Sequence, residues 1–506
     1  MATSEVPVRV LLLSEGTYPF ALGGVSNWCD MLVNDLSEVE FDLLSIIGDP
    51  RLNLQYRLPR NVIGCHPLVI WGIREVMETQ AGVRISQLIS TRRRANEQNV
   101  AAQVGGHIEL LLRDIFVDND VMRFAKTLQQ LYIAFHQIDF DRAMRSQAVW
   151  RLFLKAVQEL FPQAVAAIGY PGTSTSLAEV ADAHTLLYHW LMPLATNLPS
   201  ADVVHAVSAG LCSMLGVVAR LEYGMPFLLT EHGIYLRERY LAELDCKDGL
   251  FAKLFRTRFA RLVTEASYRY ADQISPGSNY NHRWEIRNGA PVERICTIYN
   301  GVDPQTLVPG PVVNTAAPIV VWVGRITPIK DVKTMVRAAA VVHQERPTVR
   351  FVIYGTPPKG SESYLTECLA LRNALGLAEV VDFRGFAPSI EIAFQGGDIV
   401  ALSSISEGFP FTVIEAMLCA RPVVASAVGG VPEALREDCG ITVEPSNPKA
   451  LAAGIIRLVD DPELRVRMGA LARVYASQTF TLAQCSAAYR ESYRTLAMSS
   501  TRRDAT

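Results

Sequence analysis

The segment VRVLLLSEG (residues 8–16) decides how the rest of this chain is interpreted, because it is an almost unbroken apolar run that ends in a glycine. Such a run indicates a strand buried on both faces, as in a parallel sheet. A loop with Gly23 and Gly24 follows, and then a helix that we expect to begin at about Ser26, whose hydroxyl can cap it. Similar apolar runs alternate with longer helical patterns along the chain. This alternation predicts an α/β fold with parallel sheets.

The predicted strands form two series along the chain. The first comprises residues 8–16, 41–47, 203–208 and 226–232, and the second comprises residues 318–325, 349–355, 379–385, 398–404 and 422–426. The strands of the second series follow one another closely, which is typical of a doubly wound, Rossmann-like sheet.

Two domains are expected from these series. Residues 300–317 are rich in Pro, Gly, Asn and Thr and are typical of a linker. We place the N-terminal domain at residues 1–305, with a helical elaboration over about 51–200, and the C-terminal domain at residues 306–479. Residues 480–506 are expected to form a helix that packs back towards the N-terminal domain.

Composition narrows the class of protein. Of the 506 residues, 49% are hydrophobic and 20% charged, which is enough apolar material for buried cores and excludes a disordered or fibrous chain. The net charge is 48 − 51 = −3, so no basic field favours a nucleic-acid partner. The nine cysteines are scattered without a C-x-x-C pair, which favours a reducing compartment. The first apolar run is read as a strand, because it is too short to span a membrane and no signal-peptide cleavage site follows it. We therefore expect a cytoplasmic protein.

The most informative stretch is SISEGFPFTVIEAMLCARPVVASAVGGVPEAL (404–435), which carries Glu407 and Glu415. On a single helix these carboxylates would be separated by ~12 Å of rise and could not bind one group together. Pro410 favours a helix that begins at about that residue, so Glu407 is expected in the preceding loop and Glu415 inside the helix. Carboxylates accept hydrogen bonds from sugar hydroxyls, and the helix N-terminus between them suits a phosphate. Two solvated surface glutamates are the alternative interpretation.

A second candidate site lies in VGRITPIKD (323–331), where a buried strand is followed by Arg325 and Lys330. Around a turn with Pro328, both cations can converge on one anion at the carboxyl end of a strand. Solvated loop cations are the alternative. Gly23 and Gly24 let a backbone approach a ligand closely, but they do not form a G-x-G-x-x-G motif.

Other motifs are less specific. His232 ends a predicted strand, although a single histidine is more often structural. The D-x-D sequences Asp118–Asp120 and Asp139–Asp141 lack a preceding strand, so we assign them no metal. In the helix expected at residues 251–263, cations stand beside phenylalanines, which leaves a membrane-surface face open as an alternative to a solvated one. The cations are Lys253, Arg256, Arg258 and Arg261, and the phenylalanines are Phe255 and Phe259.

Together these motifs resemble the retaining glycosyltransferases of family 4, which have the GT-B fold of two Rossmann-like domains facing an interdomain cleft. The stretches IYNGVD (298–303), DFRGF (382–386) and VGGVPE (428–433) also match that family. LLLSEGTYPFALGGVSNW (11–28) and LLTEHGIYLRERYLAEL (228–244) are similar to the PelF-like subgroup, which serves Pel exopolysaccharide synthesis in bacteria.

The resemblance implies a nucleotide-sugar donor, UDP-glucose, and a growing exopolysaccharide as the saccharide acceptor. Arg325 and Lys330 would neutralise the donor diphosphate, Glu415 would bind the ribose, Glu407 would bind the donor sugar, and His232 would lie near that sugar. Further donor-binding residues implied are Gly23, Gly24, Phe383, Arg384, Gly408, Phe409, Phe411 and Thr412.

No metal or other cofactor is expected in such an enzyme. The resemblance further implies inner-membrane polysaccharide synthase components as partners and a peripheral location at that membrane. Two other functions remain open at this point: a nucleotide-sugar epimerase, and a noncatalytic nucleotide-binding subunit of a polysaccharide secretion complex.

Overall fold

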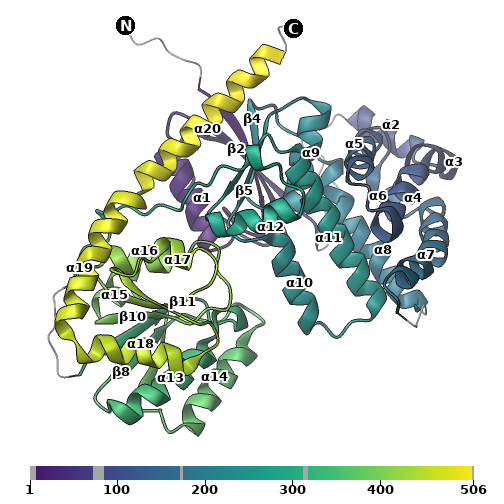
Figure 1. Cartoon of the computed structure of the whole chain (residues 1–506). Helices are drawn as coiled ribbons and strands as arrows, with labels where there is room; N and C mark the ends of the chain where they lie inside the picture. The colour runs from purple at the N-terminus through teal and green to yellow at the C-terminus, as the bar shows by residue number, and fades with distance from the viewer. Residues whose placement is uncertain (1–6, 72–84, 171–174, 311–316, 504–506) are drawn as a thin grey trace, which may run out of the picture. The chain divides into compact units, whose positions relative to one another are not determined.

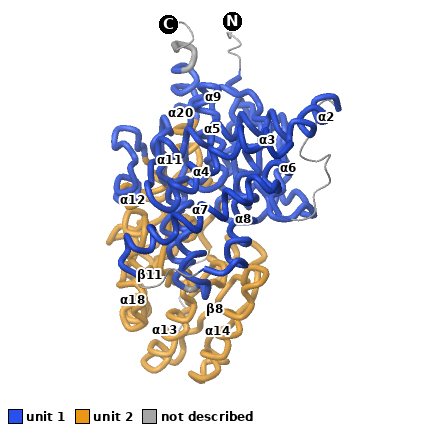
Figure 2. The backbone as a smooth tube through the Cα atoms, turned by 90° about the vertical axis from the view of Figure 1, so that its right-hand side faces the viewer, with its two compact units in different colours: residues 1–276, 283–296, 490–506 blue, residues 277–282, 297–489 orange. Residues whose placement is uncertain are grey.

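The chain builds two parallel six-stranded sheets, one in each of two compact units (Figures 1 and 2). The computed structural model describes residues 7–71, 85–170, 175–310 and 317–503. Unit 1 comprises residues 1–276, 283–296 and 490–506, and unit 2 comprises residues 277–282 and 297–489.

The sheet of unit 1 has the strand order β3-β2-β1-β4-β5-β6, and all its strand pairs are parallel. Its strands are β1 (Arg9–Glu15), β2 (Glu40–Ile47), β3 (Val62–Val69), β4 (Val203–Ala206), β5 (Phe227–Glu231) and β6 (Gln273–Pro276). The order reverses between β1 and β4, and ligands of open α/β sheets bind outside the carboxyl ends of the strands at such a switch point.

The sheet of unit 2 repeats this topology, with the order β12-β11-β10-β7-β8-β9 and parallel pairing throughout. Its strands are β7 (Ile319–Val323), β8 (Arg350–Tyr354), β9 (Val381–Gly385), β10 (Ile399–Leu402), β11 (Val423–Ser426) and β12 (Gly440–Val443). The switch point lies between β7 and β10. The predicted class, an α/β chain with two doubly wound sheets, is confirmed.

The nine strands predicted from apolar runs are all present, but three strands were missed. These are β3, β6 and β12, which all lie at sheet edges. An edge strand is covered less completely than a central one, so it needs no continuous apolar run. β12, for example, has the sequence GITV and only its first residue is fully buried.

Helices cover the sheet of unit 1, and the described residues between β3 and β4 are mostly helical (Figure 1). They are α1 (Gly24–Asp35), α2 (Ile85–Arg94), α3 (Glu97–Val100), α4 (Gly106–Arg113), α5 (Val121–Gln137), α6 (Phe140–Met144), α7 (Gln147–Ala167), α8 (Leu177–Leu191), α9 (Leu211–Glu222), α10 (Tyr235–Asp245), α11 (Leu250–Tyr270) and α12 (His282–Arg287). Residues 72–84, which fall within the expected elaboration, lie outside the described part of the chain.

The predicted cap of α1 is wrong. The helix begins at Gly24 with Gly23 as its N-cap residue, and no side chain caps it. Ser26 lies inside the helix and is buried. Glycine is also tolerated at an N-cap position, so the helix can begin directly after Gly23 and does not need the hydroxyl of Ser26 as its cap.

Unit 2 has shorter connections between its strands and helices. Its helices are α13 (Val332–Glu345), α14 (Glu362–Ala374), α15 (Ile390–Gln395), α16 (Phe411–Leu418), α17 (Val431–Ala434), α18 (Pro448–Asp460) and α19 (Pro462–Thr479). Residues 300–310 of the expected linker belong to this unit, where Val302 pairs with Thr481. The last helix, α20 (Leu482–Arg503), passes from unit 2 into unit 1 at Arg490, and within unit 1 the Tyr493 hydroxyl lies 2.8 Å from Nδ1 of His205.

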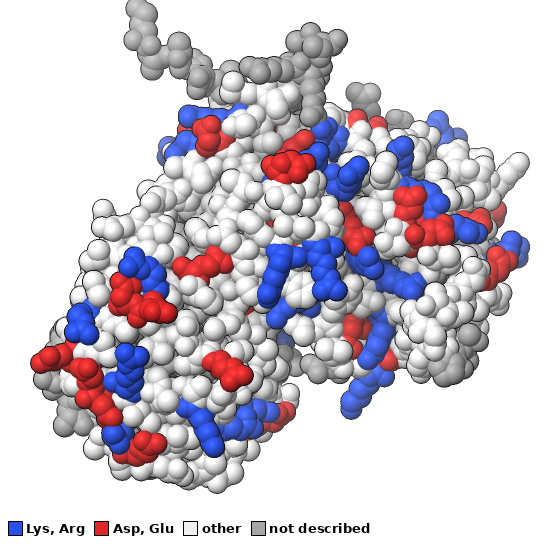
Figure 3. All heavy atoms as spheres, viewed as in Figure 1, with Lys and Arg blue, Asp and Glu red and all other residues white. Residues whose placement is uncertain are grey.

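The membrane-surface interpretation of α11 is wrong. Phe255 and Phe259 are buried in the core of unit 1 and stack on Trp190. Arg256 and Arg261 form ion pairs with carboxylates of the same unit. No helix within the described residues is long and apolar enough to cross a membrane. The face in Figure 3 carries both cationic and anionic side chains, and several cationic ones gather near the centre of the view.

Candidate active site

The main polar cluster of unit 2 joins the loops that follow β7 and β10, the two strands of its switch point. Lys330, in a single 3₁₀ turn after β7, donates to Oε1 of Glu407 at 2.5 Å. Ser404 donates to the same oxygen at 2.5 Å, and Ser403 donates to the carbonyl of Lys330 at 3.0 Å. The side chains of Lys330 and Glu407 are only 18% and 9% exposed, so this ion pair is weakly screened by solvent.

The backbone around Glu407 is held by residues whose side chains are small or absent. Gly429 has a φ of 57°, and a Cβ there would overlap the carbonyl oxygen of Glu407. Gly430 donates its N–H to Gly408 at 2.7 Å, and the Asn300 side chain donates to the carbonyl of Phe409 at 3.0 Å. The stretches VGGVPE and IYNGVD therefore shape the loop that carries Glu407.

Helix α16 begins directly after this loop, as Pro410 predicts. Pro410 is its N-cap residue and offers no side-chain acceptor, and among the described residues no group accepts from the N–H of Phe411 or Thr412. Such N–H groups and the positive end of the helix dipole suit an anion. Glu415 lies inside the helix, and burial raises the pKa of its carboxyl to about 7.

Arg325 follows the same strand as Lys330 but stands apart from the ion pair. Its side chain is exposed, and it forms no ion pair with any described residue. Phe383 and Arg384 lie in β9, where Arg384 pairs with Asp382 at 2.7 Å and lies 3.2 Å from the Tyr354 hydroxyl. Phe383 is partly buried against the core of unit 2.

Gly23 and Gly24 lie where β1 leads into α1, in unit 1. The φ of Gly23 is 168°, an extended value that any residue adopts, and a Cβ at either position would meet nothing within 4 Å. The packing of unit 1 therefore does not require glycine at either position.

His232 directly follows β5 in unit 1. Its ring packs edge-on against Trp28, with centroids 4.5 Å apart, and burial lowers its pKa to about 4, so the imidazole is neutral at pH 7. The Nε2 atom is buried and has no hydrogen-bond partner among the described residues.

A buried pair of carboxyls near His232 escaped prediction from the sequence. Glu231 accepts hydrogen bonds from the Tyr268 hydroxyl and from the N–H of Tyr235, at 3.3 Å for the latter. Both oxygens of buried Glu285 are without partners among the described residues. Burial raises the pKa of Glu231 to about 8, and burial with the nearby Glu231 raises that of Glu285 to about 9. No local sequence motif predicts this pair, because Glu231 lies in β5 and Glu285 in α12, far apart in the sequence.

The D-x-D sequences serve the fold where the structure places them. Asp120 caps α5 and Asp139 caps α6, while Asp118 pairs with Arg123 at 2.6 Å. Across the described ranges, no group of three or more His, Cys, Asp or Glu side chains is placed to hold a metal ion.

Comparison with known proteins gives this arrangement a class. Residues 307–474 match the family model of glycosyl transferases group 1. Two solved structures share the fold along nearly the whole chain: sucrose-phosphate synthase from Thermosynechococcus elongatus (TM-score 0.62, 18% identity, 97% of this chain and 100% of that one) and Alr3699/HepE from Anabaena in complex with UDP and glucose (TM-score 0.58, 17% identity, 96% and 98%). The chain is thus a transferase of the glycosyltransferase class with the GT-B fold.

A second family model matches the N-terminal part of the chain. Residues 8–293, more than half of the chain, match the model described as "Domain of unknown function (DUF3492)", and the chain belongs to that family.

Curated relatives point to the same class. They include D-inositol 3-phosphate glycosyltransferases from Thermobispora bispora (28% identity over 293 residues, 55% of this chain and 67% of that protein) and Kineococcus radiotolerans (32% over 208 residues, 36% and 48%). The chain therefore spans between about half and two thirds of the length of these two relatives.

We predict that Glu285→Gln stabilises unit 1 and that its advantage grows with pH. The folded protein holds the proton of Glu285 up to about pH 9, whereas an unfolded carboxyl loses it near its ordinary value of 4.5. Unfolding therefore becomes more favourable as pH rises between these values, and glutamine removes that penalty. Thermal melts from pH 6 to 9 measure the difference. Glu293→Gln, at an exposed position of the same unit, is the control and should show no such trend.

We also predict that Gly429→Ala destabilises unit 2 more than Gly376→Ala does. Both glycines have positive φ, 57° and 70°, but only a Cβ at residue 429 meets neighbouring atoms, the backbone of Glu407 and Gly408. The backbone strain, ~1–2 kcal/mol, is common to both variants, and the overlap adds ~1–3 kcal/mol for Gly429. Chemical denaturation compares the two, and equal midpoints would contradict the close approach.

Proposed function

We propose that the protein transfers glucose from UDP-glucose to a growing exopolysaccharide with retention of anomeric configuration and without a metal ion. The observation that carries the proposal is the Lys330–Glu407 pair beside the open N-terminus of α16, at the switch point of the unit 2 sheet. Anabaena HepE, which shares the fold, is described in complexes with UDP and with UDP-glucose. The glycosyl transferase match at residues 307–474 favours transfer over epimerisation or a noncatalytic role.

In this proposal the donor diphosphate binds Arg325, Lys330 and the N–H groups of Phe411 and Thr412. Glu407 compensates one of the two cations, so Arg325 and the helix N-terminus supply the remaining attraction. The same groups stabilise the charge that develops on the leaving diphosphate, which is the preorganised electrostatics that catalyses group transfer in a low-dielectric site.

The carboxylates and the base-binding residues complete the proposed donor site. Glu407 uses its second oxygen to accept from a hydroxyl of the donor sugar, and Glu415 accepts from the ribose. The β9 segment with Phe383 and Arg384 binds the base, and Gly408 and Phe409 line the sugar in the loop after β10.

We assign unit 1 the acceptor side of the reaction. Gly23 and Gly24 allow close approach of the donor, since the fold leaves both positions without side-chain contacts. Neutral His232 donates or accepts a hydrogen bond near the donor sugar. A cytoplasmic site at the inner membrane, next to polysaccharide synthase components, agrees with this role.

The first test is calorimetric titration of UDP, with GDP and ADP as controls, in buffer that contains EDTA. We expect Arg325→Ala to weaken UDP binding by about 2 kcal/mol, or about thirtyfold in Kd, because a cation facing the diphosphate is lost. Arg337→Ala, an exposed arginine on α13 in the same unit, is the matched control and should bind UDP as the natural protein does. Unchanged affinity in Arg325→Ala, or binding that requires a divalent metal, would refute the proposed diphosphate site.

The raised pKa of Glu415 predicts a pH dependence of donor binding. Below its pKa of about 7 the carboxyl is protonated and accepts ribose hydrogen bonds less well, so affinity should increase about tenfold from pH 6 to 8. UDP-glucose is the appropriate ligand, because its diphosphate has no ionisation near pH 6, unlike a terminal phosphate. Glu415→Gln should remove this dependence, and a profile shared by both proteins would show that another group titrates.

A further inference from the structure

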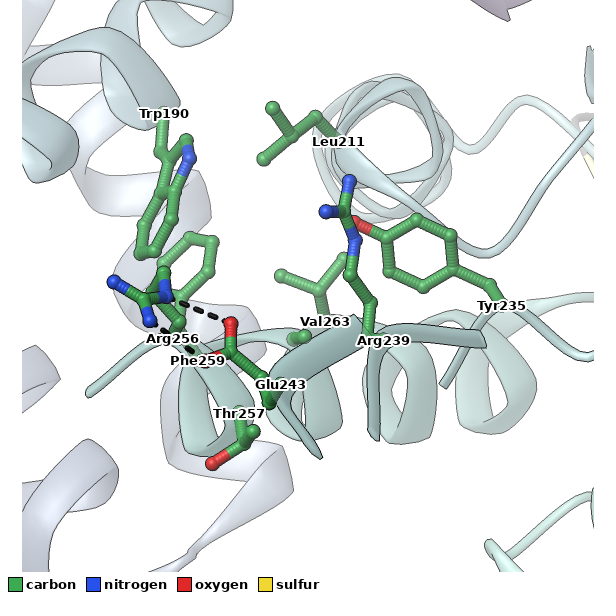
Figure 4. A pocket seen from close by; sticks show the side chains of 10 residues that line it. Trp190, Leu211, Tyr235, Arg239, Glu243, Arg256, Thr257, Phe259 and Val263 are labelled. Atoms are coloured by element: carbon green, nitrogen blue, oxygen red, sulfur yellow. Dashed lines mark hydrogen bonds and ion pairs between the residues drawn. The ribbon is translucent and has the colours of Figure 1, made fainter. Parts of the chain in front are cut away.

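Unit 1 contains a pocket that the donor site does not use, with a cavity volume of about 70 Å³ that opens into about 470 Å³ of atom-free space including solvent at its mouth (Figure 4). It lies between α8, α10 and α11 and reaches Leu211, the first residue of α9. All of its lining residues belong to unit 1.

Aromatic rings form two of its walls. On one side Trp190 stacks on Phe259, with ring centroids 4.5 Å apart and an interplanar angle of 21°. On the other side stands Tyr235, as Figure 4 shows, with the guanidinium of Arg239 at 5.1 Å from its ring centroid. Flat apolar surfaces of this kind pack against the C–H faces of a pyranose ring, while a purely aliphatic pocket would offer no such match.

Charged groups occupy the edges between these walls. Arg256 forms a two-pronged ion pair with Glu243, at 2.7 and 2.6 Å, and a further one with Asp248 at 2.8 Å. Arg256 is therefore compensated, and it does not attract an anion strongly. Oxygen atoms of Glu243 accept hydrogen bonds, and the N–H groups of Arg239 donate them, which is the mixture that sugar hydroxyls require.

The pocket also adjoins the switch point of the unit 1 sheet. Glu15, the last residue of β1, accepts from the N–H of Leu211 at 2.7 Å, so its carboxyl closes the N-terminus of α9. A Cβ at Gly210 would approach both Glu15 and the ring of Tyr235, which shows how closely the strand end and the pocket wall pack. With the N-terminus of α9 already occupied by a carboxyl, a phosphate is disfavoured here and an uncharged ligand is favoured.

We propose that this pocket binds a neutral pyranose ring of the saccharide acceptor, packed against Trp190 with hydroxyl groups bonded to Arg239 and Glu243. The assignment as acceptor rests on the proposed glycosyltransfer, whereas the binding of the ring rests on the pocket alone. Arg239 is the specificity-determining contact, because among the cations that line the pocket it has no ion pair with a described residue.

Saturation-transfer NMR tests ring binding directly, with methyl glucopyranosides, methyl galactopyranosides and methyl N-acetylglucosaminides as probes. At least one glycoside should bind the natural protein, and Arg239→Gln should weaken its binding about tenfold, the loss expected for a hydrogen bond from a charged group. The side chain of Arg239 is exposed on α10, so the fold tolerates glutamine there. Arg269→Gln, at an exposed position of α11, is the matched control and should leave binding unchanged.

The outcomes separate the pocket from the donor site. Absence of binding by every glycoside, or equal binding by Arg239→Gln and Arg269→Gln, overturns the pocket assignment even where UDP titrates normally. Tighter binding of glucuronic acid than of methyl glucoside would overturn the choice of a neutral ring. Failure of UDP to bind any of these proteins refutes the proposed function and leaves the glycoside result standing. The UDP affinity of Arg239→Gln is expected to equal that of the natural protein.

Discussion

The ion pair of Lys330 and Glu407 is the interaction on which the site in unit 2 depends. It ties the turn after β7 to the loop after β10, the two strands between which the sheet order reverses. Both side chains are largely buried, so the loss of either partner would leave an unpaired charge in a poorly solvated place, at a cost of several kcal/mol. The hydroxyl of Ser404 shares the same carboxylate oxygen and orients the second one. The pair therefore fixes the start of α16 in space while lowering the net charge of the cluster, which leaves exposed Arg325 as the uncompensated cation.

Central strands could be predicted from the sequence because burial on both faces demands continuous apolar runs, as in VVWV of β7. The edge strand β9 was predicted in the same way, whereas QISP of β6 and GITV of β12 were missed because neither contains a continuous apolar run. The position of Glu407 before α16 and of Glu415 inside it followed from Pro410 alone, because proline acts through local backbone geometry. The start of α1 was predicted at the wrong residue. Serine is a stronger indicator of an N-cap than glycine, so Ser26 was preferred to Gly23.

Long-range contacts account for what sequence reasoning missed in the sites. Lys330 and Glu407 were predicted separately as donor-binding residues. They are 77 positions apart in the sequence, and in the structure they form an ion pair with each other. Glu231 and Glu285 interact across 54 positions of sequence, and a single buried glutamate in a sequence has no feature that distinguishes it from a solvated one. The glycines of VGGVPE are explained by the approach of the Glu407 backbone to Gly429, which is a property of the folded loop and of no shorter segment.

The two sheets share a topology but differ in the partners of the carboxyls near their strand ends. In unit 2, Glu407 pairs with Lys330 and stands beside N–H groups of Phe411 and Thr412 that have no acceptor among the described residues, an environment that suits a diphosphate. In unit 1, burial raises the pKa of Glu15, and the pKa values of Glu231 and Glu285 lie at about 8 and 9, so these two carboxyls hold their protons at pH 7. In the pocket of unit 1, Arg256 is compensated by Glu243 and Asp248, so hydrogen bonds and aromatic faces would decide its specificity more than net charge does. The two ligands that we propose follow this difference, with a charged nucleotide bound in unit 2 and an uncharged saccharide in unit 1.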